Sequence, residues 1–181
     1  MKQIVALAFV ALALPASALA QNSEAIDKAL AAAPARARDA TTVIHWKADG
    51  TYDTLKKGTN TLVCYDRSDL PGMQPFAVQC TSLGNLNRVA QNRKFEAIAD
   101  RAERKKQLDA AEASGTRVKP EYGSVWLTMS GPDQSKARIH TTIAVPGATA
   151  QSIGLPDKPN ASGLWLMDAG TTTAHLMIPG S

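Results

Sequence analysis

The spacing of hydrophobic and polar residues changes twice along the chain, which predicts strands, then helices, then strands again. Residues 42–46 (TVIHW) are β-branched and aromatic, as is typical of a strand. The pair Asp49-Gly50 favours the two-residue turn of a β-hairpin, so the chain should return over residues 51–55. A turn at 56–58 and a strand over 60–65 complete a predicted three-stranded meander.

The spacing over residues 83–114 is helical, but its apolar residues form two stripes. The first stripe comprises Leu83, Leu86 and Ala90, and the second comprises Phe95, Ile98 and Ala102. At about 100° per residue the two stripes point in different directions, so one straight helix cannot bury both. We expect two helices, or one kinked helix, with the break at the polar residues 91–94. Before the first strand, Ser23 should cap a short helix that ends near Pro34.

Strand patterns return in the last third of the chain. They cover residues 122–129, 138–145, 163–167 and 173–178, and glycine- and proline-containing turns separate them. This order predicts an α+β fold: an antiparallel sheet of about six or seven strands, built from the N-terminal meander and the C-terminal strands, with the helical segment packed on one face. A small β-sandwich or a partial barrel with a helical insertion is the alternative.

The N-terminus has the three parts of a secretory signal peptide. Lys2 precedes an apolar run over 4–14, and Ala18-Leu19-Ala20 supplies an A-x-A cleavage site. The run is shorter than the roughly 20 apolar residues of a membrane-spanning helix. We therefore expect a signal peptide over 1–20, a single domain over 21–181, no membrane span, and a periplasmic or secreted location.

The chain has two cysteines, Cys64 and Cys80. In an oxidising compartment two cysteines most simply form one disulfide, and no C-x-x-C spacing indicates a redox-active pair. The residues between them, 66–75, are polar and contain proline and glycine, as is typical of a loop. Closing this loop should stabilise the fold by about 3 kcal/mol.

Composition and the motifs that the sequence lacks argue against several classes of function. Lys and Arg number 20 against 16 Asp and Glu, and the formal net charge of +4 is too small to indicate nucleic-acid binding. Aromatic residues make up only 5%, which disfavours a surface built to stack bases or sugars. The sequence lacks a phosphate-binding glycine loop, a G-x-S-x-G elbow, an H-E-x-x-H motif and an EF-hand loop, so we expect no cofactor.

Three histidines and two tryptophans are the candidate site residues. His45, His140 and His175 fall on predicted strands, out of phase with the strongest apolar positions. If their strands are neighbours, the three rings could converge and ligate zinc or copper. Three unrelated histidines are the simpler interpretation, so we assign no metal site. Trp126 and Trp165 also lie on strands, where core packing competes with a role in a ligand surface.

Several short motifs resemble a group of small, uncharacterised secreted bacterial proteins. The resemblance rests on Gly58-Thr59-Asn60 followed by Cys64, a second cysteine after a proline-containing loop, an apolar strand near Trp126, and the terminal residues 175–178 (HLMI). It implies an exported bacterial protein and assigns no catalytic or binding residue.

We therefore expect an exported, non-enzymatic binding or accessory protein, which would hold its ligand in a concave apolar groove. One alternative is an interaction or inhibitor module that presents the Cys64–Cys80 loop, near residues 70–73, to an envelope protein. Another is a small hydrolase or metal-dependent enzyme in which one of the histidines acts with Asp66 or Asp69.

Overall fold

The computed structural model describes residues 16–159 and 163–178, and the side chains of residues 21–159 and 163–178. The strands are β1 (Thr42–Trp46), β2 (Tyr52–Lys56), β3 (Leu62–Asp66), β4 (Phe76–Ser82), β5 (Val125–Gly131), β6 (Arg138–Ala144), β7 (Trp165–Met167) and β8 (His175–Met177). The helices are α1 (Ala16–Leu30), α2 (Leu86–Glu96), α3 (Arg101–Ala113) and α4 (Ala150–Ile153), with 3₁₀ turns η1 (Ala35–Ala40) and η2 (Leu83–Asn85).

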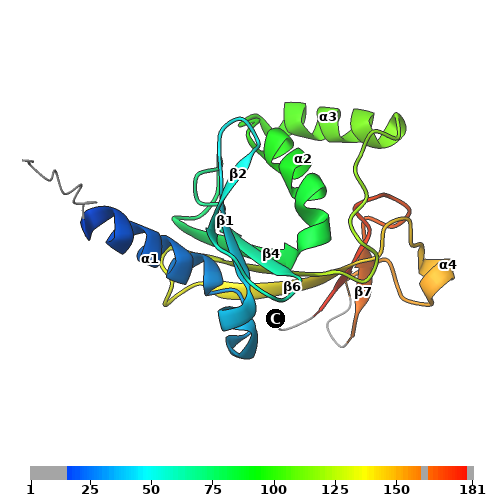
Figure 1. Cartoon of the computed structure of the whole chain (residues 1–181). Helices are drawn as coiled ribbons and strands as arrows, with labels where there is room; N and C mark the ends of the chain where they lie inside the picture. The colour runs from blue at the N-terminus through cyan, green and yellow to red at the C-terminus, as the bar shows by residue number, and fades with distance from the viewer. Residues whose placement is uncertain (1–15, 160–162, 179–181) are drawn as a thin grey trace, which may run out of the picture.

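Within the described residues the strands form one open sheet of eight, in the order β2-β1-β3-β4-β5-β6-β8-β7. Helices α2 and α3 lie on one side of this sheet and α1 lies on the other (Figure 1). The predicted α+β fold is therefore confirmed, with eight strands instead of six or seven. None of the described helices is long and apolar enough to cross a membrane.

The predicted hairpin is present, but residues 47–51 connect its strands instead of the predicted two-residue turn, and the predicted meander is wrong. Strands β1 and β2 pair antiparallel, with Trp46 opposite Tyr52. Strand β3 does not continue beside β2; it pairs in parallel with β1, on the other edge of that strand. The burial of the two strands explains the order. Strand β3 is mostly buried and needs a neighbour on each side, whereas β2 is mostly exposed and suits the edge of the sheet.

The crossover from β2 to β3 passes very close to the start of β1, and this explains the Gly58-Thr59-Asn60 motif. The backbone N–H groups of Thr59 and Asn60 both donate to the carbonyl of Ala40, at 2.8 and 3.0 Å. A Cβ atom on Gly58 would lie 2.2 Å from the same carbonyl oxygen, so this position has no room for a side chain.

Strand β4 was not predicted, although it carries the second cysteine. It pairs antiparallel with β3, and the register places Cys64 directly opposite Cys80. The predicted Cys64–Cys80 disulfide is present, and both residues are fully buried.

The helical segment is divided, as predicted, but not at residues 91–94. Helix α2 runs through these polar residues, and the break lies at 97–100, where the Asp100 carboxylate accepts from the N–H of Glu103 and caps α3. The polar residues of α2 do not interrupt the helix because other elements satisfy them; Arg93, for example, pairs with Asp69. Ser23 is not a cap, since α1 already begins at Ala16.

The sheet buries side chains on both faces, which we call the α1 face and the α2 face. On the α1 face, Val43, Cys64, Val78 and Cys80 pack with residues 29–33, at the end of α1. On the α2 face, the buried residues are Ile44, Trp46, Val63, Tyr65 and Val89. A third cluster, around Leu166, holds the C-terminal strands.

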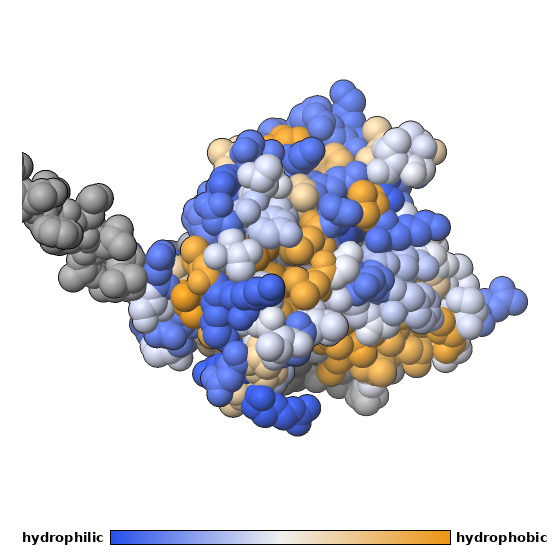
Figure 2. Space-filling model, viewed as in Figure 1, coloured by the Kyte–Doolittle hydropathy of each residue, from blue (hydrophilic) through white to orange (hydrophobic). Residues whose placement is uncertain are grey.

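Beyond α1, the α1 face is more open. Val125 and Ile139 on β5 and β6 are exposed, and Figure 2 shows hydrophobic residues gathered along the lower edge of the molecule in this region. Both positions can therefore accept a substitution without disturbing the core.

Candidate functional site

A cavity of about 170 Å³ lies beside α2 on the α2 face of the sheet, which we call the Arg88 cavity. It is lined by Gln79, Arg88, Asn92, Pro120, Trp126, Thr142, Ala144, Thr173 and His175. The lining combines an apolar wall with several polar groups, and among the described residues it includes no carboxylate.

The sheet register and the helix repeat bring these residues together. Trp126 on β5 is opposite Thr142 on β6, and Ala144 on β6 is opposite His175 on β8, so all four side chains share the α2 face. Arg88 and Asn92 are four residues apart on α2, so they lie on the same side of this helix.

Arg88 is 3% exposed and makes three hydrogen bonds to other described residues, all to neutral oxygens. It donates to the carbonyl of Val118 at 2.6 Å, to the hydroxyl of Thr172 at 3.0 Å, and to that of Thr173 at 2.7 Å. Burial lowers the pKa of Arg88 to about 10, helped by the charge of Arg117 and opposed by that of Glu112. The guanidinium is therefore still positively charged at neutral pH.

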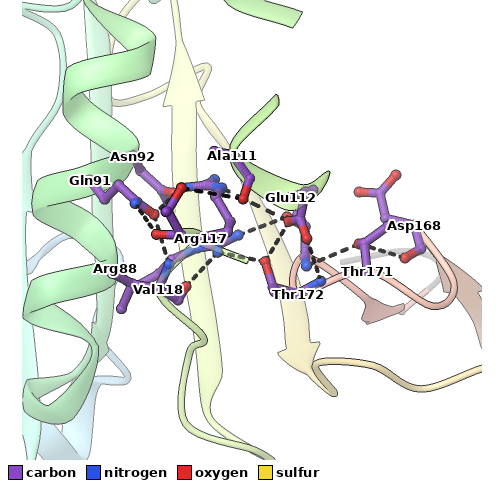
Figure 3. Close-up of polar contacts among 12 residues, drawn as sticks. Arg88, Gln91, Asn92, Ala111, Glu112, Arg117, Val118, Asp168, Thr171 and Thr172 are labelled. Carbon is purple, nitrogen blue, oxygen red and sulfur yellow. Dashed lines mark hydrogen bonds and ion pairs between the residues drawn. The ribbon is translucent and has the colours of Figure 1, made fainter. Parts of the chain in front are cut away.

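A second buried guanidinium, that of Arg117, lies next to the first (Figure 3). Arg117 is 7% exposed and donates to the side-chain oxygens of Gln91 and Asn92, both at 2.8 Å, and its guanidinium carbon lies 4.9 Å from the centre of the Phe95 ring. Its Nε has no hydrogen-bond partner among the described residues, and Oε1 of Glu112 lies 4.0 Å away. Burial lowers the pKa of Arg117 as well.

Glu112 is the carboxylate that both arginines share. It accepts hydrogen bonds from the backbone N–H of Thr172 and from the hydroxyls of Thr172 and Thr173. Burial alone would raise the pKa of Glu112, but these hydrogen bonds and the charge of Arg88 outweigh burial and hold the pKa below its ordinary value. Glu96 also acts on Arg117, but it is hydrogen-bonded to Arg67 at 2.8 Å. Two carboxylates thus face three guanidinium groups, so the cluster keeps an excess positive charge beside the cavity.

His175 forms the sheet side of the cavity, and its orientation is set by the backbone. Its Nδ1 lies 2.8 Å from the carbonyl oxygen of Thr173, and since a carbonyl only accepts, Nδ1 carries the proton. The carboxylate of Asp168 is 4.0 Å from the same nitrogen. The other ring nitrogen, Nε2, is left for a different partner.

The structure separates the three histidines. His140 and His175 share the α2 face, but His45 lies on the opposite face, since the buried Ile44 and Trp46 on either side of it point toward α2. In the part of the chain that the structure describes, no group of three or more His, Cys, Asp or Glu residues could hold a metal ion. Convergence of the three histidines on one face is therefore wrong.

The two tryptophan candidates also differ. Trp126 lines the Arg88 cavity and packs against the buried cluster of the α2 face. Trp165 lies at the end of the sheet on β7, opposite Met177, and is not part of the lining.

The two carboxylates proposed to act with a histidine have basic partners. Asp66 is 2.5 Å from the ammonium of Lys28, and Asp69 is 2.5 Å from the guanidinium of Arg93. Burial raises the pKa of Asp66, but hydrogen bonds from Lys28 and Ser68 outweigh it and leave the pKa below its ordinary value. These ion pairs hold the base of the loop between the cysteines.

The loop between the cysteines presents only part of the predicted interaction segment. Leu70 is buried in the protein, whereas Pro71 and Gly72 are exposed. The segment 70–73 therefore does not offer its leucine to a partner.

Sequence patterns did not indicate Arg88, Arg117 or Glu112. In a helical projection Arg88 lies off the apolar stripe of its helix, which is typical of an exposed residue. Its burial depends on the segment at Val118 and the threonines near 172, which are 30 and 84 residues away in the chain. The one local signal is the spacing of Arg88, Asn92 and the aromatic Phe95, which places all three on the same side of α2.

Comparisons with protein families, curated proteins and solved structures find no match for this chain.

Proposed function

We propose that this chain is an exported, non-enzymatic binding protein of a bacterial envelope or secretome, and that a small ligand occupies the Arg88 cavity. The observation that carries this proposal is the combination of the apolar Trp126, Pro120 and Ala144 with convergent polar groups in one cavity. Ligand sites are typically apolar hollows with a few placed polar groups. A cavity of roughly 150 Å³ can hold benzene, so about 170 Å³ suits a ligand with a single ring.

Export is supported by the signal-peptide pattern of residues 1–20, which lie mostly outside the described residues. The buried Cys64–Cys80 disulfide is consistent with an oxidising compartment.

Binding is favoured over catalysis because the polar groups around the cavity already have fixed partners. The Thr173 hydroxyl accepts from Arg88 and donates to Glu112, so its proton is committed. The Nδ1 of His175 donates to a backbone carbonyl. Such groups are suited to orienting a ligand.

The test fills the cavity and compares ligand binding. Thr142→Phe places a ring in the lining, and Ile139→Phe is the matched control, since it adds a ring to the other face of the same strand. Both variants are produced as the full chain, purified from the periplasm and checked by circular dichroism. A panel of single-ring compounds is then screened by thermal shift and by tryptophan fluorescence.

We expect at least one compound to raise the melting temperature of the wild type and of Ile139→Phe, but not that of Thr142→Phe. Native mass spectrometry of the purified wild type should show the same dependence for any ligand retained from the cell. Binding that is equal in Thr142→Phe, or a panel with no binder and a bare native mass, would contradict the proposal.

A further inference from the structure

We infer that the ligand of the Arg88 cavity is a small organic anion with a carboxylate head group, an inference that rests on the proposed function. Three features of the cavity support a carboxylate: the unused donors of Arg88, the unused donors of its neighbours, and the charge of the cluster.

The guanidinium of Arg88 keeps one edge unused. A guanidinium has five N–H donors, and three of them are engaged, two on Nη1 and one on Nη2. The two that remain, Nε–H and the second N–H of Nη2, have no acceptor among the described residues. Two parallel N–H groups on one edge of arginine match the two oxygens of a carboxylate.

The neighbouring groups in the lining also offer donors. The Oδ1 of Asn92 is identified by its partner: Arg117 only donates, so the atom that it contacts must be the amide oxygen. The NH₂ group of Asn92 is therefore the part left for a ligand. A carboxylate, which only accepts, satisfies the remaining donors of Arg88 and Asn92 at once.

Charge favours the same head group. Arg88 is the one permanently charged residue among the described residues of the lining, and the nearby Glu112 reaches it only through threonine hydroxyls and is shared with Arg117. A buried charge without a counter-ion is unfavourable, and an anionic ligand supplies that counter-ion. The apolar wall at Trp126 gives the rest of the ligand an organic surface to contact.

The experiment compares benzoate with benzamide, which has nearly the same shape but no charge. Isothermal titration calorimetry of the full chain should show that benzoate binds at least about tenfold more tightly than benzamide. Acetate and inorganic phosphate are titrated in parallel, because they separate the contribution of the ring from that of the charge.

Two isosteric variants locate the charge effect. Asn92→Asp places a carboxylate in the lining and keeps an oxygen for Arg117, so we expect it to weaken benzoate at least about tenfold and to weaken benzamide much less. Asn87→Asp makes the same substitution at an exposed position of the same helix and should bind benzoate as the wild type does.

The outcomes separate this inference from the proposed function. If benzamide binds as tightly as benzoate and Thr142→Phe blocks both, the cavity binds a ligand but the head group is not anionic. If phosphate binds as tightly as benzoate, the site accepts anions without an organic part, and the inference is wrong. If neither benzoate nor acetate binds at millimolar concentration, the carboxylate inference is overturned, and the thermal-shift panel alone decides the proposed function.

Discussion

Removal of the Cys64–Cys80 disulfide should cost a large part of the stability of this domain. The two residues are 16 apart in the sequence and face each other across β3 and β4. In the chain-entropy model, opening a loop of this length gives the unfolded state about 3 kcal/mol at 25 °C.

The double variant Cys64→Ala/Cys80→Ala loses packing as well. Both sulfur atoms lie in the buried cluster of the α1 face, where Sγ of Cys80 is 3.9 Å from the carbonyl oxygen of Ala29. Deletion of two buried atoms from a close-packed core should cost roughly another 1–2 kcal/mol. The total of about 4–5 kcal/mol is at least about a quarter of the roughly 5–15 kcal/mol by which a typical domain is stable.

Urea denaturation separates the two contributions. The reduced wild type keeps its sulfur atoms, so its loss relative to the oxidised protein measures the loop term alone, and the double variant measures both. As a control, a reductant should leave the double variant unchanged. A reduced wild type within about 1 kcal/mol of the oxidised protein would refute the loop argument.

Three further predictions follow from single contacts. Glu112→Gln should destabilise the protein at pH 7. Because the folded state lowers the pKa of Glu112, the difference in stability between the variant and the wild type should shrink as the pH falls below 4.5. A difference between their urea midpoints that is the same at pH 7 and pH 3 would contradict this. Gly58→Ala should lower the free energy of unfolding by at least about 2 kcal/mol, since its Cβ would meet the backbone at Ala40. Thr59→Ala, at an exposed position, should lower it little. Equal melting temperatures of the two variants would refute the close approach. Asp100→Ala should remove the cap of α3 and cost about 1 kcal/mol by thermal denaturation, and an unchanged melting temperature would show that the cap is not needed.

Glu112 affects both the proposed binding site and the stability of the protein. Its hydrogen bonds to Thr172 and Thr173 hold the loop that also carries two of the acceptors of Arg88. Loss of that carboxylate should therefore disturb the cavity as well as the stability. Asn92→Asp tests the cavity without touching this anchor.

The sequence alone determined the features that depend on neighbouring residues. The pair Asp49-Gly50 indicated a hairpin, in which Gly50 adopts a positive φ of 84°, and residues 42–44 of its first strand are β-branched. The disulfide followed from two cysteines in a chain with an export pattern. Gly115, after α3, has the positive φ of 70° that a helix end favours.

Only the tertiary structure decided which elements became neighbours. Strand β3 pairs with β1 and not with β2 because of how much of each strand is buried. A local sequence pattern does not contain that information. The position of the helix break was decided by partners of the polar residues of α2 that come from other parts of the chain, such as Asp69 and Arg117. The same reason applies to the site. The local sequence predicts that Arg88 is exposed, because local hydrogen bonds place it in a helix but do not determine its burial. Its burial depends on long-range packing, here on acceptors that lie 30 and 84 residues later in the chain.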